Sequence, residues 1–125
     1  MQRELAWAEC ELAAYQRGFL FLRLDFQHNV LVWKDSNRWF NNFVRGLPRE
    51  KMAGYREIVS DFIRQASPEP DLDLEKIQRD FIWRLSYQEV DGSEEFVLTG
   101  SDLSSLPWQK LAAAFAEAAG RSFSL

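Results

Sequence analysis

His28 is the single histidine of the chain, so a catalytic triad or a Cys–His pair would have to use it. Asp25 and Asn29 lie close to it in the sequence. However, residues 27–29 separate two apolar stretches and have the polar composition of a hairpin turn. We therefore expect an exposed turn histidine here rather than a general base.

Cys10 is the only cysteine, so the chain cannot form an intramolecular disulfide. Glu9 and Glu11 flank it, and their negative charges disfavour a reactive thiolate. One cysteine and one histidine cannot supply the four ligands of a structural zinc site. The six glycines are too widely spaced for a phosphate-binding loop. These residue types predict no metal, no cofactor and no catalytic cysteine.

Carboxylates can act as an acid–base pair without a histidine. Asp25, Asp71 and Asp73 are the candidates, and they define one hypothesis, a small carboxylate-dependent hydrolase. Helix capping or simple solvation is the more ordinary role for Asp71 and Asp73. Because no two carboxylates stand out as acid and base, we assign no catalytic residue.

An interaction role is indicated for residues 38–45, where aromatic side chains alternate with polar ones. Tryptophan together with arginine and asparagine is a composition that protein interfaces favour. The predicted partner-binding residues are Arg38, Trp39, Phe40 and Phe43. They would lie on an edge strand or loop that holds another protein or a second copy of the chain, with ordinary packing as the alternative.

Charge is unevenly distributed along the chain, whose net charge of −4 argues against broad nucleic-acid binding. Residues 34–64 carry seven basic and four acidic side chains, whereas residues 65–102 carry three basic and ten acidic ones. The acidic region suggests a second hypothesis, an immunity-type inhibitor that captures a basic toxin enzyme. Two solvated faces of opposite sign would give the same distribution.

The sequence also predicts a cytoplasmic protein with no membrane contact. No stretch approaches the roughly 20 apolar residues that a membrane helix needs. The first ten residues, MQRELAWAEC, lack the basic-then-apolar order of a signal peptide.

Hydrophobic periodicity predicts the positions of strands and helices. Strands are expected at residues 19–26, 30–34, 38–44, 81–87 and 94–100. Helical stripes follow Pro48 and Pro107, and Gly120 is expected to end the last helix. Residues 2–16 are ambiguous, with a helix favoured over the first arm of a hairpin.

These elements predict an α+β fold in a single domain, residues 1–125. The expected architecture is an antiparallel sheet of about four to five strands with two or three helices packed on one face. Aromatic residues make up 14% of the chain, and most of them fall on strand and helix faces that should form the core.

Several of these features recur in a fixed order: W-x-L-x-Y at Trp83, Leu85 and Tyr87, then Asp91-Gly92, then Gly100, then Pro107. With the Leu47-Pro48 entry to the middle helix, this order resembles a group of small bacterial α+β domains whose activity is uncharacterised. The resemblance implies an α+β fold, favours a first strand at residues 4–15 and implies no catalytic residues.

The leading expectation is a non-enzymatic cytosolic domain that acts through protein–protein contacts, either with another protein or as a homodimer. It requires no cofactor and no nucleic acid. The immunity-type inhibitor and the hydrolase are the alternatives.

Overall fold

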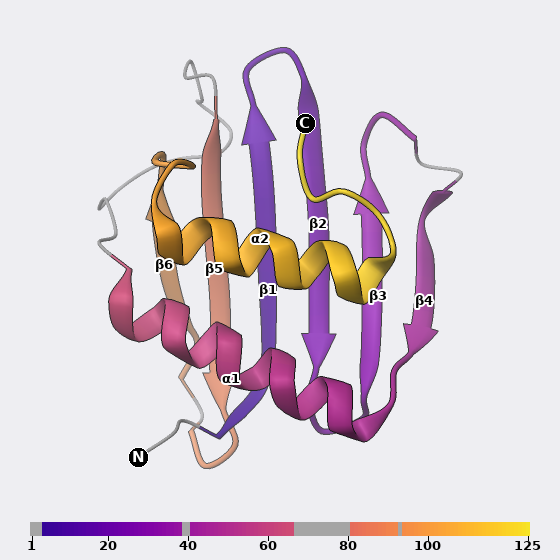
Figure 1. Cartoon of the computed structure of the whole chain (residues 1–125), viewed down its shortest axis with the longest axis vertical. Coiled ribbons are helices and arrows are strands. Elements are labelled where there is room, and N and C mark those ends of the chain that lie inside the picture. Colours follow the sequence, from indigo (N-terminus) through magenta and orange to yellow (C-terminus); the bar gives the residue numbers. More distant parts are fainter. Residues whose placement is uncertain (1–3, 39–40, 67–80, 93) are drawn as a thin grey trace.

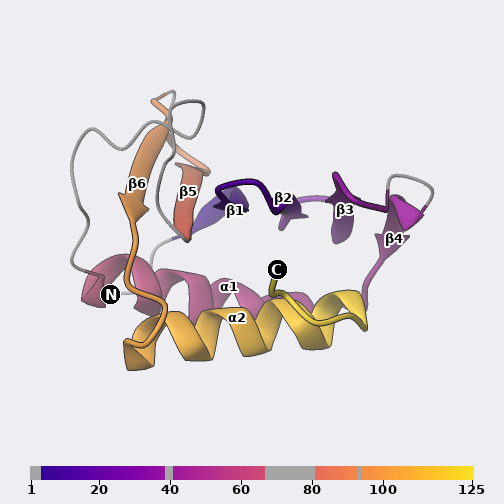
Figure 2. The same cartoon turned by 90° about the horizontal axis from the view of Figure 1, so that it is seen from above.

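The computed structural model describes residues 4–38, 41–66, 81–92 and 94–125. They form a six-stranded antiparallel sheet with two helices on one side of it (Figures 1 and 2). The elements are, in chain order, β1 (Leu5–Ala14), β2 (Gly18–Asp25), β3 (Val30–Asp35), β4 (Phe43–Gly46), α1 (Arg49–Gln65), β5 (Ile82–Glu89), β6 (Phe96–Gly100) and α2 (Leu106–Ala119). The strand order across the sheet is β4-β3-β2-β1-β5-β6. The predicted α+β class is confirmed, but the predicted count of four to five strands was too low.

The missing strand is β1, which replaces the helix favoured at residues 2–16. It lies in the middle of the sheet, paired with β2 on one side and β5 on the other. Its small apolar side chains at alternate positions, among them Ala8, Cys10 and Leu12, are buried against the helices. Burial between two neighbouring strands therefore overrides the helix propensity of its alanines and glutamates.

The β2–β3 hairpin has the predicted turn at residues 27–29. Asn29 adopts a positive φ of 57°, a conformation that asparagine tolerates well. The next strand differs from prediction, because β4 begins at Phe43 rather than Arg38 and ends at Gly46. It forms one edge of the sheet, as expected for this segment.

Both helices follow the predicted stripes. In α1 the buried side chains are Met52, Tyr55, Val59, Ser60, Phe62 and Ile63. In α2 the Ser105 hydroxyl accepts a hydrogen bond from the Trp108 amide at 3.3 Å, which caps the helix start. Gly120 has a φ of 69° and ends the helix in the left-handed conformation that glycine favours.

Aromatic side chains fill the layer between the sheet and the helices. Trp83 of β5 stacks on Trp108 of α2 at 5.8 Å between ring centroids, and Phe62 of α1 meets its ring edge-on at 5.1 Å. The segment after α2 turns back along the helix side of the sheet (Figure 1), and its Phe123 is buried against Trp33 and Phe115. The described elements thus share one hydrophobic core.

Both described helices lie on one face of the sheet, and none of the described helices covers the opposite face (Figure 2). Arg23 forms an ion pair with Glu9, and its guanidinium group lies 4.7 Å from the centre of the Trp7 ring. Lys34 lies over Phe21 at 5.3 Å. Because acidic, basic and aromatic side chains on this face pair with one another, it carries no strong charge of one sign.

Candidate protein-interaction site

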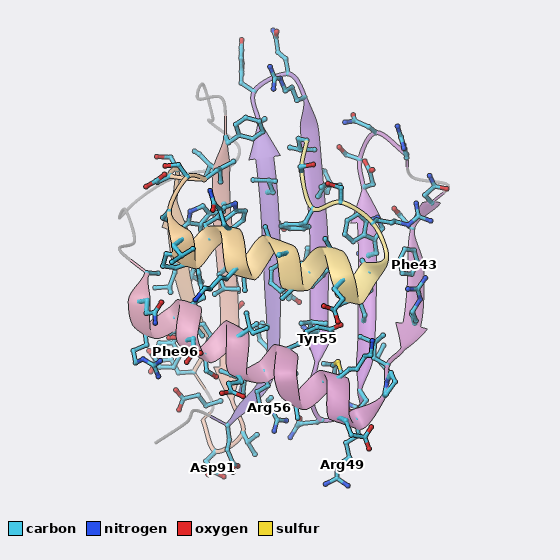
Figure 3. All side chains as sticks on the ribbon, viewed as in Figure 1. Phe43, Arg49, Tyr55, Arg56, Asp91 and Phe96 are labelled. Atoms are coloured by element: carbon cyan, nitrogen blue, oxygen red, sulfur yellow. The ribbon has the colours of Figure 1, made fainter. Side chains whose placement is uncertain are left out.

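Of the four predicted partner-binding residues, Arg38 and Phe43 lie at or beside the β4 edge of the sheet. Arg38 is exposed in the turn after β3, where its amide donates to the Asp35 carbonyl at 3.2 Å. Phe43 is half-buried at the start of β4, and Figure 3 shows it at the edge of the sheet. Trp39 and Phe40 lie outside the described residues.

Phe43 is held by one aromatic ring and two arginines. Its ring stacks on Trp33 at 6.2 Å, with an interplanar angle of 16°. The guanidinium carbons of Arg45 and Arg121 lie 4.8 and 5.2 Å from the ring centre. Arg45 also donates to the carbonyl of Ala119 at 3.2 Å, at the C-terminal end of α2, where the helix dipole favours a positive charge.

These contacts form a basic-aromatic cluster, defined here as Phe43, Arg45 and Arg121. A shallow cavity of about 390 Å³ lies beside it, lined by Asn41, Asn42, Phe43, Val44, Arg45 and Arg121. The sequence indicated Phe43 and the range that includes Arg45. It contained no signal for Arg121, because that residue reaches the cluster only through the packing of α2 on β3 and β4.

The opposite edge of the sheet has the contrary charge. Asp91, Glu94 and Glu95 are exposed in the β5–β6 connection, and Glu95 directly precedes the exposed Phe96. Asp91 and Phe96 are labelled in Figure 3. Phe96 was predicted to face the core, and it does share a face with Tyr87, on which it stacks at 5.3 Å. It remains exposed because β6 is an edge strand.

Two further cavities adjoin the helices. One, of about 330 Å³, lies between α1 and α2 and is lined by Ile58, Asp61, Phe62, Gln65, Pro107, Lys110, Ala113, Ala114 and Glu117. The other, of about 270 Å³, lies where α1 ends near β6, and Trp83 and Gly100 are among its lining residues. Among the described lining residues, each carboxylate is engaged by another side chain: Asp61 accepts a hydrogen bond from Arg64, Glu117 from Tyr55 and Asp102 from Ser104.

Asp25 and His28 are in contact, with 2.9 Å between the carboxylate Oδ2 and the ring Nδ1. The same carboxylate accepts hydrogen bonds from the Gln27 and His28 amides, so it stabilises the turn. Partial burial raises the pKa of Asp25, but the hydrogen bonds and the His28 ring outweigh burial and hold this pKa below its usual value. The His28 side chain is 74% exposed, in agreement with the predicted turn histidine.

The remaining carboxylates and the cysteine add no catalytic geometry. Asp71 and Asp73 lie outside the described residues. Burial, and to a smaller extent the charge of Glu11, raises the pKa of the Cys10 thiol. Within residues 4–38, 41–66, 81–92 and 94–125, no three His, Cys, Asp or Glu side chains converge in a way that could hold a metal ion.

Comparison of the chain with protein-family models and with curated proteins finds no match. Among the described helices, none is long and apolar enough to cross a membrane. The resemblance of the C-terminal half to small bacterial α+β domains stays a prediction. Function therefore has to be inferred from the surfaces described above.

Proposed function

We propose that this chain is a cytoplasmic, non-enzymatic domain that binds another protein through β4 and the basic-aromatic cluster beside it. The observation that carries this proposal is the composition of this one edge. It combines an exposed aliphatic side chain, Val44, with the aromatic ring of Phe43, which two arginine side chains contact. Aromatic residues and arginine are enriched where proteins bind each other and dominate the binding energy there.

The cluster is also preorganised for binding. Arg45 is fixed by the Ala119 carbonyl, and Phe43 is fixed by Trp33, so a partner would meet side chains whose positions are already set. Fixing side chains before binding reduces the entropy lost on association. Ordinary packing explains why Phe43 is half-buried, but it does not explain Val44, which is 70% exposed on the same strand.

The test compares two matched substitutions. Val44→Glu places a charge on the β4 edge, and Val97→Glu places the same charge on β6, where Val97 is 45% exposed. Both variants should fold, as thermal unfolding can verify, because neither side chain is buried. Affinity purification with the tagged chain should recover a partner that Val44→Glu loses and Val97→Glu keeps. If the wild type recovers none, or both variants retain the same partner equally, the proposal is wrong.

A second function, inhibition of a basic toxin enzyme, is favoured by the opposite edge. There, exposed Asp91, Glu94 and Glu95 lie beside exposed Phe96 and Val97. An acidic rim around apolar side chains suits a basic partner, because charge complementarity speeds capture. Co-expression with a basic toxin encoded next to this chain should protect cells, and Glu94→Lys with Glu95→Lys should abolish protection. Survival that is independent of both substitutions would exclude this function.

A further inference from the structure

Among the described strands, none pairs with the outer side of β4, so this edge offers backbone groups as well as side chains. The Leu47 amide donates to the Asn29 carbonyl at 2.9 Å, just beyond the register pair Val30 and Gly46. Hydrogen-bonded and non-hydrogen-bonded pairs alternate along an antiparallel ladder. Phe43 and Arg45 therefore direct their amides and carbonyls toward β3, whereas Val44 and Gly46 direct theirs away from the sheet.

This outward backbone is sterically open. Val44 is 70% exposed, and a Cβ atom added at Gly46 would have no neighbour within 4 Å. Arg45 is exposed as well, although its guanidinium group reaches back to α2. An extended segment could thus lie along residues 44–46 without displacing a described side chain.

The charge around this edge is positive in a chain that is negative overall. Residues 34–47 contain three basic side chains, Lys34, Arg38 and Arg45, but only one carboxylate, Asp35. Arg121, in the segment after α2, adds a further positive charge beside Phe43. Asp35 is already engaged, since it accepts a hydrogen bond from the Asn37 amide at 2.9 Å. An incoming strand with carboxylates would find basic partners here, whereas a basic strand would be repelled.

In the register that pairs both outward-facing residues of β4, a second copy of the chain fits this edge poorly. If Val44 paired with Gly46 of a second copy, antiparallel geometry would set the two Arg45 side chains directly opposite each other. Like charges in such a pair are destabilising. In that register the edge therefore favours a segment of a different chain.

We propose that β4 accepts an extended acidic segment of a partner protein as a seventh strand of the sheet. This inference rests on the proposed function and specifies its ligand. The Val44 and Gly46 backbone would supply the hydrogen bonds, as in other cases of strand addition to a sheet edge. Alternate residues of the segment would face the two sides of the sheet. Those on the helix side meet Arg45 and Arg121 and are acidic, and those on the open side meet Val44 and are apolar.

The probes are three fluorescent ten-residue peptides that alternate valine with glutamate, glutamine or lysine. The glutamate peptide should bind the full chain most tightly, and the glutamine peptide about fivefold more weakly, because it lacks two partly exposed charge pairs. Raising the salt concentration should reduce this difference. Binding of the lysine peptide as tightly as the glutamate peptide would overturn the proposal.

The backbone contribution is tested at Val44. Val44→Pro removes an amide that faces away from β3, and proline is tolerated on edge strands for this reason. This substitution should lower the affinity for the glutamate peptide about tenfold or more. Val44→Thr keeps the amide, so its affinity for this peptide should be close to that of the wild type. Unfolding curves verify that both variants fold. Equal binding by the two variants would exclude strand addition.

Amide chemical shifts locate the peptide independently of affinity. The largest changes should occur at residues 43–46, and changes confined to β6 would contradict the inference. If no peptide binds but a partner protein is still lost with Val44→Glu, strand addition is wrong and the proposed function stands. If neither the peptide nor a partner protein binds, both are wrong.

Discussion

Gly100→Ala should destabilise the protein, although it adds only one methyl group. Gly100 lies opposite Trp83 in the β5–β6 register. A Cβ atom at this position would come within 3 Å of the Trp83 indole, at 2.5 Å from Cε2 and 2.8 Å from Nε1. Ordinary van der Waals contacts are 3.4–4 Å, so the indole ring or strand β6 would have to move.

Movement of the indole ring is restricted, because Trp108 stacks on it and Phe62 makes a T-shaped contact with it. Overpacking of a core typically costs about 1–3 kcal/mol. The cavity of about 270 Å³ beside Trp83 and Gly100 gives some room for adjustment, which excludes the upper end of that range. Replacing glycine also stabilises the folded state by about 0.4–1 kcal/mol through the unfolded chain. We expect a net loss of about 0.5–2 kcal/mol.

For a domain of this size, that loss lowers the Tm by about 2–10 °C. Urea unfolding gives the free energy, and near-ultraviolet circular dichroism reports the Trp83–Trp108 stacking. Gly46→Ala is the matched control on an edge strand, because its added Cβ has no neighbour within 4 Å. It should leave the stability unchanged or slightly higher.

Trp83→Phe supplies a rescue test, because the smaller ring leaves room for the methyl group. In the Trp83→Phe background, Gly100→Ala should reduce the free energy of unfolding much less than it does in the wild type. A double-mutant cycle measures this coupling between the two positions. The reasoning fails if Gly100→Ala matches the wild type in stability and near-ultraviolet spectrum, or if the two substitutions are simply additive.

Three further predictions concern titratable groups. Cys10, which is fully buried, should react with a thiol reagent such as dithionitrobenzoate only when the protein unfolds, and rapid labelling of the native protein would contradict its burial. Asp25→Ala should cost about 1 kcal/mol at pH 7. Since the pKa of Asp25 is lower in the folded state, that cost should shrink as the pH falls below about 4, the range where the unfolded group protonates; a pH-independent difference would refute this. Tyr55→Phe removes a 3.2 Å hydrogen bond to Glu117 between the helices and should cost about 0.5–1 kcal/mol in urea unfolding. Burial and the Glu117 charge raise the pKa of Tyr55, so the wild-type advantage should be lost above about pH 10.

Most elements of the fold could be predicted from the sequence, because their apolar residues recur at one clear period. The exception, β1, is consistent with both periods. Leu5, Ala8 and Leu12 have helical spacing, whereas positions 6, 8, 10, 12 and 14 are all apolar, as a strand requires. Local propensity could not decide between them, because the deciding term is burial between β2 and β5, and β5 is distant from β1 in sequence.

The candidate site was predictable only in part, for a similar reason. Aromatic and polar alternation identified Phe43, whose ring the structure places at the sheet edge. Arg121 could not be identified, because its contact with Phe43 depends on how the segment after α2 packs against the sheet. That packing is fixed by the contact between Phe123 and Trp33. The outward direction of the Val44 backbone could not be predicted either, because it depends on the register between β3 and β4.

The shortness of β4 bears on what its exposed edge can bind. An unpaired edge normally promotes aggregation unless charge, short length or a covering element prevents it. At the other edge, Glu94 and Glu95 precede β6, and its last residues, Thr99 and Gly100, are buried. β4 has only four residues, so a neutral strand could form few backbone hydrogen bonds with it. Appreciable affinity must then come from charge as well as from backbone pairing. Dependence on both charge and backbone pairing discourages pairing between two copies that both carry Arg45. Acidic strands are the ligands that gain both attraction to the arginines and backbone hydrogen bonds.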